Sequence, residues 1–79
     1  MTENKLLQMI GLQIREWRKD AKMTQQDLAK KAGMTQADIS GFERKGGRIS
    51  GFYRIQRLVE STGHSLSELV LKMPSTNND

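Results

Sequence analysis

The chain contains no cysteine, a single proline and a single histidine among its 79 residues. Without cysteine it has no disulfide and no thiolate metal ligand. Because His64 is the only imidazole, a Ser-His-acid arrangement is remote, and no Gly-rich loop is followed by Lys-Ser or Lys-Thr. For His64 itself we expect no acidic partner and a role in helix capping or packing rather than in metal binding. We therefore predict a protein that is not an enzyme and has no catalytic residues, cofactor or metal.

Long hydrophobic runs are also missing. No apolar segment approaches the length that crosses a bilayer, and no signal-peptide pattern opens the sequence. These absences favour a cytoplasmic protein with no membrane partner. Hydrophobic residues make up 35% of the chain, which fits one compact helical domain with a polar surface. A chain this short buries limited apolar surface, so its stability should be modest or helped by self-association.

Positive charge is in excess, with 13 Lys and Arg against 9 Asp and Glu and a net charge of +4. A surplus of this sign favours a polyanionic partner through counterion release. Its placement is more informative, because Arg44, Lys45 and Arg48 lie close together in the sequence. Lys30 and Lys31 are better interpreted as solvated side chains that point away from a partner.

Two copies of one four-residue pattern start at Thr24 and at Thr35, eleven positions apart. Each places a Thr at a helix start and an acid, Asp27 or Asp38, three residues later. This arrangement satisfies otherwise unpaired amide donors at a helix N-terminus. The segment between the two copies has room for about two helical turns and a tight corner at Gly33. Two short helices joined in this way form a helix-turn-helix, whose second helix can lie in the DNA major groove.

Hydrophobic spacing extends this pattern to five helices. We predict helices over Lys5–Asp20, Gln25–Ala32, Gln36–Arg44 and Gly51–Ser61, and a short one that follows a third capping signature at Ser65–Glu68. The predicted inward-facing or helix-borne apolar residues are Leu6, Ile10, Ile14, Trp17, Met23, Leu28, Ala29, Ala32, Met34, Ile39, Phe42, Ile49, Phe52, Ile55, Leu58, Val59, Leu66, Leu69 and Val70. Gly11 either weakens the first helix or marks a close approach. We divide the chain into a DNA-binding domain at 1–73 and a disordered C-terminal tail at 74–79.

The segment from Gln25 to Arg44 resembles the helix-turn-helix of the phage repressor and Cro family, often called the Xre type. Ala29 is the small residue where the two helices approach, Gly33 lies in the turn, and Met23–Ala29 is similar to the usual opening of the motif. The resemblance runs from about Ile10 to Leu69. It implies an all-α, five-helix, lambda-repressor-like DNA-binding domain with the helix-turn-helix formed by helices 2 and 3.

The resemblance also implies roles for individual residues. The positions that face DNA bases are Gln36, Ala37, Ser40 and Gly41, and the positions that contact phosphates are Gln25, Gln26, Arg44, Lys45 and Arg48. Gln25 should also brace the recognition helix, and Gln36 is suited to adenine because its amide can bond N6 and N7 together. Arg18 and Glu43 match an ion pair that ties the first helix to the end of the recognition helix. Gly41 departs from the family pattern, since a longer side chain often reaches the groove there.

From these features we predict a transcriptional regulator, most readily a repressor, that binds an inverted repeat in double-stranded DNA as a homodimer. It would associate with the nucleoid when bound. Three alternatives stay open: an antitoxin that represses its own operon and binds a toxin, a controller protein of a restriction–modification system, and an adaptor that has lost DNA binding. The toxin or polymerase would be the protein partner. For the antitoxin, the candidate contact residues are Leu7, Met9, Leu12, Leu71 and Met73.

Overall fold

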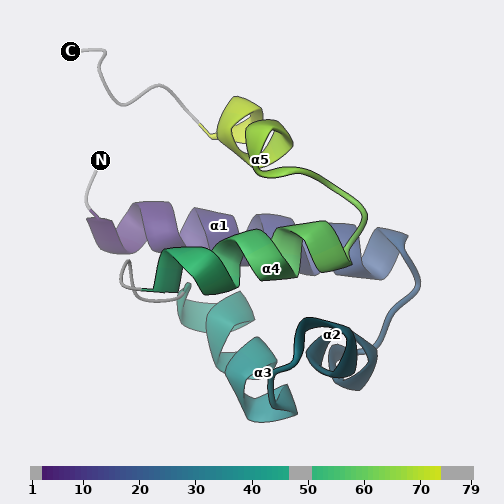
Figure 1. Cartoon of the computed structure of the whole chain (residues 1–79). Helices are drawn as coiled ribbons and strands as arrows, with labels where there is room; N and C mark the ends of the chain where they lie inside the picture. Colours follow the sequence, from purple (N-terminus) through teal and green to yellow (C-terminus); the bar gives the residue numbers. More distant parts are fainter. Residues whose placement is uncertain (1–2, 47–50, 74–79) are drawn as a thin grey trace, which may run out of the picture.

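The computed structural model describes residues 3–46 and 51–73. These ranges form five helices, α1 (Glu3–Asp20), α2 (Gln25–Ala32), α3 (Gln36–Lys45), α4 (Phe52–Ser61) and α5 (Leu66–Lys72), with no strand among the described residues. In Figure 1, α2 and α3 lie on one side of α4 and α5 lies on the other. The predicted all-α, five-helix architecture is confirmed. Arg48, Ile49 and the predicted tail at 74–79 lie outside the described residues.

Three helices begin with the reciprocal capping arrangement that the sequence indicates. At α2 the Asp27 N–H donates to Thr24 Oγ1 (3.0 Å) and the Thr24 N–H donates to Asp27 Oδ2 (2.9 Å). Thr35 with Asp38 repeats this at α3, and Ser65 with Glu68 repeats it at α5. Because an N–H bond favours the charged carboxylate, the backbone of Thr24 lowers the pKa of Asp27. The helix starts are therefore fixed locally, by residues three positions apart.

Positive backbone φ follows four of the helices in the described ranges, and the ends of α2 and α1 show two ways of reaching it. Gly33 ends α2 with φ 72°, a conformation that glycine adopts without steric cost. Lys22 follows α1 with φ 58° and is the one non-glycine residue of the described ranges with positive φ. Its neighbour closes the turn, since the Met23 N–H donates to the Arg18 carbonyl (3.1 Å). This turn points Met23 toward the core, as predicted.

One hydrophobic core joins all five helices. Its buried members are Ile14, Trp17, Leu28, Ala29, Ala32, Ile39, Ile55, Leu58, Val59 and Leu69, with Ile10, Met23, Met34, Phe42, Leu66 and Met73 packed against it. A helix as short as α2 has little stability alone, so this shared core is what holds the helix-turn-helix together. No helix in the described ranges is both long and apolar enough to cross a membrane.

The buried side of α1 includes the predicted Ile14 and Trp17, but it has Leu7 in place of Leu6. Leu7, Gly11, Ile14 and Arg18 are all buried, whereas Leu6 is only half-buried. These four positions form one stripe along the helix, and α3 packs against it. A Cβ at Gly11 would overlap the carbonyl oxygen of Phe42, so the close approach expected at Gly11 is present. The stripe therefore fixes α3 against α1.

Two expectations about hydrophobic side chains, at Leu7 and Phe52, are wrong. Leu7 was expected on the exposed side of α1, but it is buried where the backbone of Gly46, just after α3, packs against it. Phe52 was expected in the core, but 57% of it is exposed because it is the first residue of α4, one turn before the buried Ile55. Val70 of α5 is exposed, since only Leu69 of that pair faces the core.

Candidate nucleic-acid interface

The outer side of α3 is polar or small, and its inner side holds it in place. Ile39 and Glu43 are buried at 1% and 4% exposure, which fixes the rotation of the helix about its axis. The four predicted base-contact positions then fall elsewhere on the helix: Gln36 and Ala37 are exposed, and Ser40 and Gly41 are half-buried. A Cβ added at Gly41 would meet no atom within 4 Å, so this part of the surface is open.

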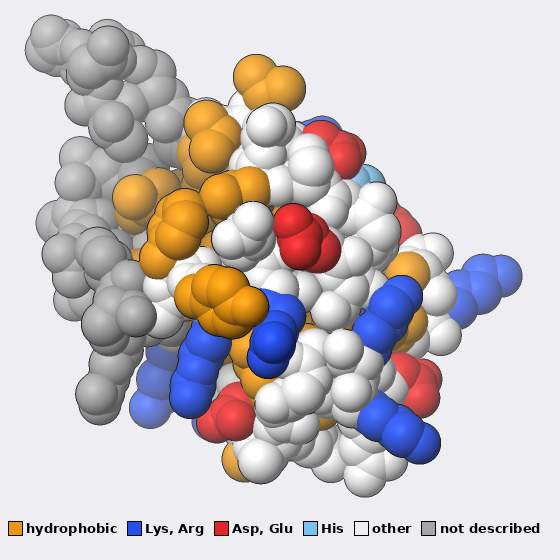
Figure 2. Space-filling view, in the orientation of Figure 1, with side chains coloured by type: hydrophobic (Ala, Val, Ile, Leu, Met, Phe, Trp, Pro, Cys, Tyr) orange, Lys and Arg blue, Asp and Glu red, His pale blue; other side chains and the backbone are white. Residues whose placement is uncertain are grey.

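Cationic and amide side chains are exposed on both α2 and α3. Arg44 and Lys45 are exposed in the last turn of α3, and Gln26 is exposed in the first turn of α2. Lys30 and Lys31 are exposed in the last turn of α2. In Figure 2, Lys and Arg side chains surround the region of α2 and α3, while acidic side chains there are few. Arg48, the remaining predicted phosphate contact, lies outside the described residues.

Arg18 and Glu43 form the ion pair expected between α1 and α3. Arg18 Nε lies 2.6 Å from Glu43 Oε2, and Arg18 Nη2 donates to Glu43 Oε1 at 3.0 Å. The third guanidinium nitrogen, Nη1, donates to the Met23 carbonyl oxygen at 2.7 Å. Both side chains are almost fully buried. A two-bond pair of this kind sets direction as well as distance, so it locks the C-terminal half of α3 onto α1.

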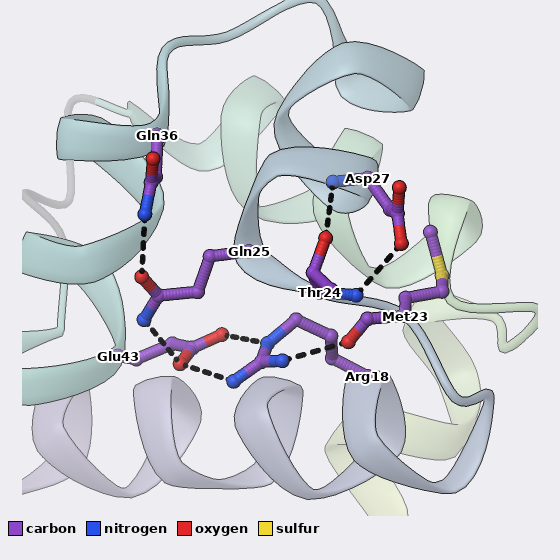
Figure 3. A network of polar contacts seen from close by, with 7 residues as sticks. All are labelled: Arg18, Met23, Thr24, Gln25, Asp27, Gln36 and Glu43. Atoms are coloured by element: carbon purple, nitrogen blue, oxygen red, sulfur yellow. Dashed lines mark hydrogen bonds and ion pairs between the residues drawn. The ribbon is translucent and has the colours of Figure 1, made fainter.

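Gln25 connects this pair to the exposed end of α3. Its Nε2 donates to Glu43 Oε1 (3.2 Å), and its Oε1 accepts from Gln36 Nε2 (3.5 Å). Figure 3 shows Arg18, Glu43, Gln25 and Gln36 following one another from the buried side to the surface. Sequence reasoning predicted that Gln25 braces α3 but not the two contacts that do so. One available signal was that Gln25 and Gln36 each follow the capping Thr of their helix directly.

Two arginines of α4, which the sequence analysis did not single out, also hold the motif. Arg57 Nη1 donates to the Ala32 carbonyl oxygen at the end of α2 (3.5 Å), and its guanidinium lies 5.3 Å from the centre of the Tyr53 ring. The pKa of Asp38 is lowered mainly by hydrogen bonds from Thr35 and to a smaller extent by the charge of Arg54. The Arg54 charge is therefore close enough to influence the start of α3.

His64 corrects one expectation. It was expected to lack an acidic partner, but His64 Nδ1 lies 2.8 Å from Glu68 Oε2, four residues along the chain. Its ring also stacks on Trp17. The predicted packing role of His64 is therefore present, with a partner that the analysis overlooked. Within the described ranges, no three His, Cys, Asp or Glu side chains gather in a way that could hold a metal ion.

An exposed polar helix face, held by a second short helix and flanked by cations, is the arrangement with which helix-turn-helix domains enter the major groove. The family model for helix-turn-helix proteins matches residues 14–69 of this chain. The chain therefore belongs to the helix-turn-helix family, which confirms the resemblance drawn from Gln25–Arg44. Membership makes it a DNA-binding protein of transcription regulation and not an enzyme.

Among solved structures, the chain is similar to the clp gene regulator ClgR from C. glutamicum, with a TM-score of 0.75 and 21% sequence identity. The match covers 84% of this chain and 83% of that chain. At this level of identity the likeness shows the fold. No curated protein sequence matches the chain.

Proposed function

We propose that this protein is a sequence-specific repressor that binds an inverted repeat in double-stranded DNA as a homodimer and acts in the cytoplasm at the nucleoid. The observation that carries the proposal is the outer side of α3, where Gln36, Ala37, Ser40 and Gly41 contribute nothing to the hydrophobic core. Residues that do not pack are free to meet a ligand. In a helix-turn-helix, the ligand that meets this side is the edge of the base pairs.

Base recognition in this proposal centres on Gln36. Its amide carries one acceptor and one donor group side by side, which matches the N6–H and N7 of adenine. Ala37 supplies a methyl group for contact with a thymine methyl, and the Ser40 hydroxyl supplies a short hydrogen bond. Gly41 adds no side chain, so the backbone of α3 can approach the bases closely at that turn.

Phosphate contacts set the position of the helix but do not read sequence. We assign them to Gln25, Gln26, Arg44, Lys45 and Arg48. Gln25 has two amide hydrogens and uses one for Glu43, which leaves the other for a phosphate oxygen. The cations add an electrostatic attraction that weakens as salt displaces it.

A homodimer is supported by apolar side chains that the fold leaves uncovered. Figure 2 shows hydrophobic side chains gathered over α4 and α5, and the large exposed ones on these helices are Phe52, Tyr53, Val70 and Leu71. A second copy that covers these side chains would have to place the two α3 helices about 34 Å apart, on successive major grooves, to bind an inverted repeat. Occupancy of a promoter by this dimer would exclude polymerase.

The test starts with selection of bound sequences from a random DNA pool, which should return a palindrome. Binding to the selected site is then measured for wild type, Gln36→Ala and the control Gln8→Ala on the exposed side of α1. Gln36→Ala should cost about 1–3 kcal/mol and relax preference at one base pair per half-site, whereas Gln8→Ala should change neither quantity. A selection that enriches nothing, or an affinity that is insensitive to salt, would overturn the proposal.

The antitoxin is a second candidate because the structure leaves apolar side chains exposed away from α3. Leu12 of α1 and Leu71 of α5 are 54% and 83% exposed. Leu7 no longer belongs to this candidate surface, since it is buried. A second small protein that co-purifies with the wild-type chain, and is lost in Leu12→Ser, would favour the antitoxin.

A further inference from the structure

Every hydrogen bond in the polar chain from Gln36 to Arg18 points toward the same carboxylate. Gln36 donates to Gln25, Gln25 donates to Glu43, and Arg18 donates to Glu43 from the opposite side (Figure 3). Glu43 is 4% exposed, and its Oε1 receives both Gln25 and Arg18. The carboxylate is therefore the acceptor on which the whole chain converges.

The direction of these bonds follows from the chemistry of the groups. An ionised carboxylate can only accept hydrogen bonds, so the Gln25 atom that faces Glu43 has to be its nitrogen. The Gln25 oxygen then faces α3, where only a donor can meet it, and the Gln36 atom on that side has to be its nitrogen as well. Turning either amide by 180° would place two acceptors or two donors together and lose a hydrogen bond.

From this we infer that Glu43 is a positioning residue for base recognition: through Gln25 it fixes which way the Gln36 amide is turned and so restricts the base that Gln36 accepts. The inference rests on the proposed role of Gln36. With its nitrogen committed to Gln25, Gln36 offers its oxygen and one remaining N–H in a fixed order. Adenine offers the complementary order with N6–H and N7. A base with an acceptor in place of N6–H meets the Gln36 oxygen and is rejected.

Glu43 itself is buried on the side of α3 that faces α1, so it has no direct access to DNA. Its effect on sequence preference would be purely indirect. This separates the role proposed here from that of Arg44 and Lys45, whose exposed charges would act on affinity for any sequence.

The first test is Glu43→Gln, with folding checked by circular dichroism and binding measured on the selected site and on the same site with the Gln36 base pair replaced. A Gln at 43 can present either oxygen or nitrogen to Gln25, so the order along the chain is no longer fixed. The ratio of affinities for the two sites measures discrimination at that base pair. We expect this ratio to fall about 2- to 10-fold, because a Gln36 amide that is free to turn can make one hydrogen bond with the wrong base that it could not make before. Affinity for the adenine site and the salt dependence should stay close to those of wild type.

A second variant covers the case in which Glu43→Gln, which removes the charge opposite Arg18, fails to fold. Gln25→Lys leaves the Arg18–Glu43 pair intact, can still donate to Glu43 and to a phosphate, but has no acceptor for Gln36. It should lose the same discrimination, which is read as the ratio of affinities for the two sites because Gln25 is itself a proposed phosphate contact. In a Gln36→Ala background, neither variant should change base preference further, because the amide they orient is gone.

The outcomes separate the two proposals. If Gln36→Ala loses affinity equally on every sequence, base reading by Gln36 fails, and the positioning role fails with it. If Gln36→Ala behaves as proposed but folded Glu43→Gln and Gln25→Lys keep full discrimination, only the positioning role is overturned. A readout without DNA is the side-chain amide NMR signals of Gln36, which Glu43→Gln should shift although Glu43 and Gln36 share no hydrogen bond.

Discussion

The imidazole of His64 lies flat on the indole of Trp17, with ring centroids 4.0 Å apart and ring planes 9° apart. Trp17 belongs to α1, and His64 lies in the turn between α4 and α5. The other contact of the imidazole is the hydrogen bond with Glu68 in the first turn of α5. The stack therefore joins the end of α1 to the start of α5, two elements that are far apart in the sequence.

We predict that His64→Ala destabilises the protein by about 1 kcal/mol, because aromatic pairs contribute about 0.5–1.5 kcal/mol beyond the area they bury. The free energy of unfolding from a denaturant titration would measure this. Trp17 is the single tryptophan, so its fluorescence follows the contact directly. Ser67→Ala, at an exposed position of α5, is the control and should be close to neutral. Equal stability of His64→Ala and wild type would contradict the prediction.

Acid should weaken the fold through the three capping carboxylates. The pKa of Glu68 is lowered by the hydrogen bond with His64 and by the Ser65 N–H, and those of Asp27 and Asp38 are lowered mainly by the N–H groups of Thr24 and Thr35. A lowered folded-state pKa contributes stability that is complete above the unfolded-state pKa and is lost as pH falls through the folded value. Stability should therefore decline from about the ordinary Glu value of 4.5 and continue to fall below the ordinary Asp value of 3.8.

The measurement is the free energy of unfolding between neutral and strongly acidic pH. In Asp27→Asn the acid-dependent loss should be smaller than in wild type, because one of the three groups no longer titrates. The control is Asp20→Asn, because exposed Asp20 makes no capping hydrogen bond among those found in the described residues. This variant should leave the slope of the free energy of unfolding against pH unchanged. Identical slopes for Asp27→Asn and wild type would refute this account.

Two glycines inside helices should respond to alanine in opposite ways. At Gly11 the new methyl group would overlap the Phe42 carbonyl, so Gly11→Ala forces α1 and α3 apart and should cost about 1–3 kcal/mol, as other overpacked sites do. At Gly41 nothing lies within 4 Å, and Ala is the better helix former by about 0.8–1.0 kcal/mol. Gly41→Ala should therefore stabilise the chain. Melting temperatures of the two variants, measured side by side, decide the matter.

Lys22 offers a simple stabilising change. Its φ of 58° is left-handed, which costs a residue with a Cβ about 1 kcal/mol and costs glycine little. Lys22→Gly should raise the free energy of unfolding by up to about 1 kcal/mol. Lys22→Ala removes the same charge but keeps the Cβ, and it should bring no such gain. If both variants gain equally, the effect comes from charge and not from the backbone.

Much of the helix-turn-helix could be predicted because its signals are local. Thr24 and Thr35 cap within their own helices, and Gly33 ends α2 by its own backbone freedom. Such interactions span three or four residues and can be seen in the sequence. The outer side of α3 followed from the same spacing, whereas contact of its residues with DNA stays a prediction.

The errors fall where the answer depends on how helices meet. Whether Leu6 or Leu7 is buried depends on how α3 covers α1, and the sequence alone favoured Leu6, although Ile10, Ile14 and Trp17 of the same predicted row do meet the core. Phe52 continues the hydrophobic row of α4 but is the first residue of the helix. Burial at that position depends on which other elements pack nearby and not on helical periodicity. The contacts of Gln25 with Glu43 and of His64 with Trp17 join residues far apart in the chain. No spacing rule within one helix can indicate them.

Packing on α3 is concentrated in Ile39, Phe42 and Glu43, and none of the four outer positions belongs to the hydrophobic core. Substitutions at those four positions therefore meet little resistance from folding. Under the proposed function, a few codon changes at these positions would give the protein a new target site while its scaffold stays as it is. Duplicated copies would be able to diverge toward different operators long before their shared framework changes.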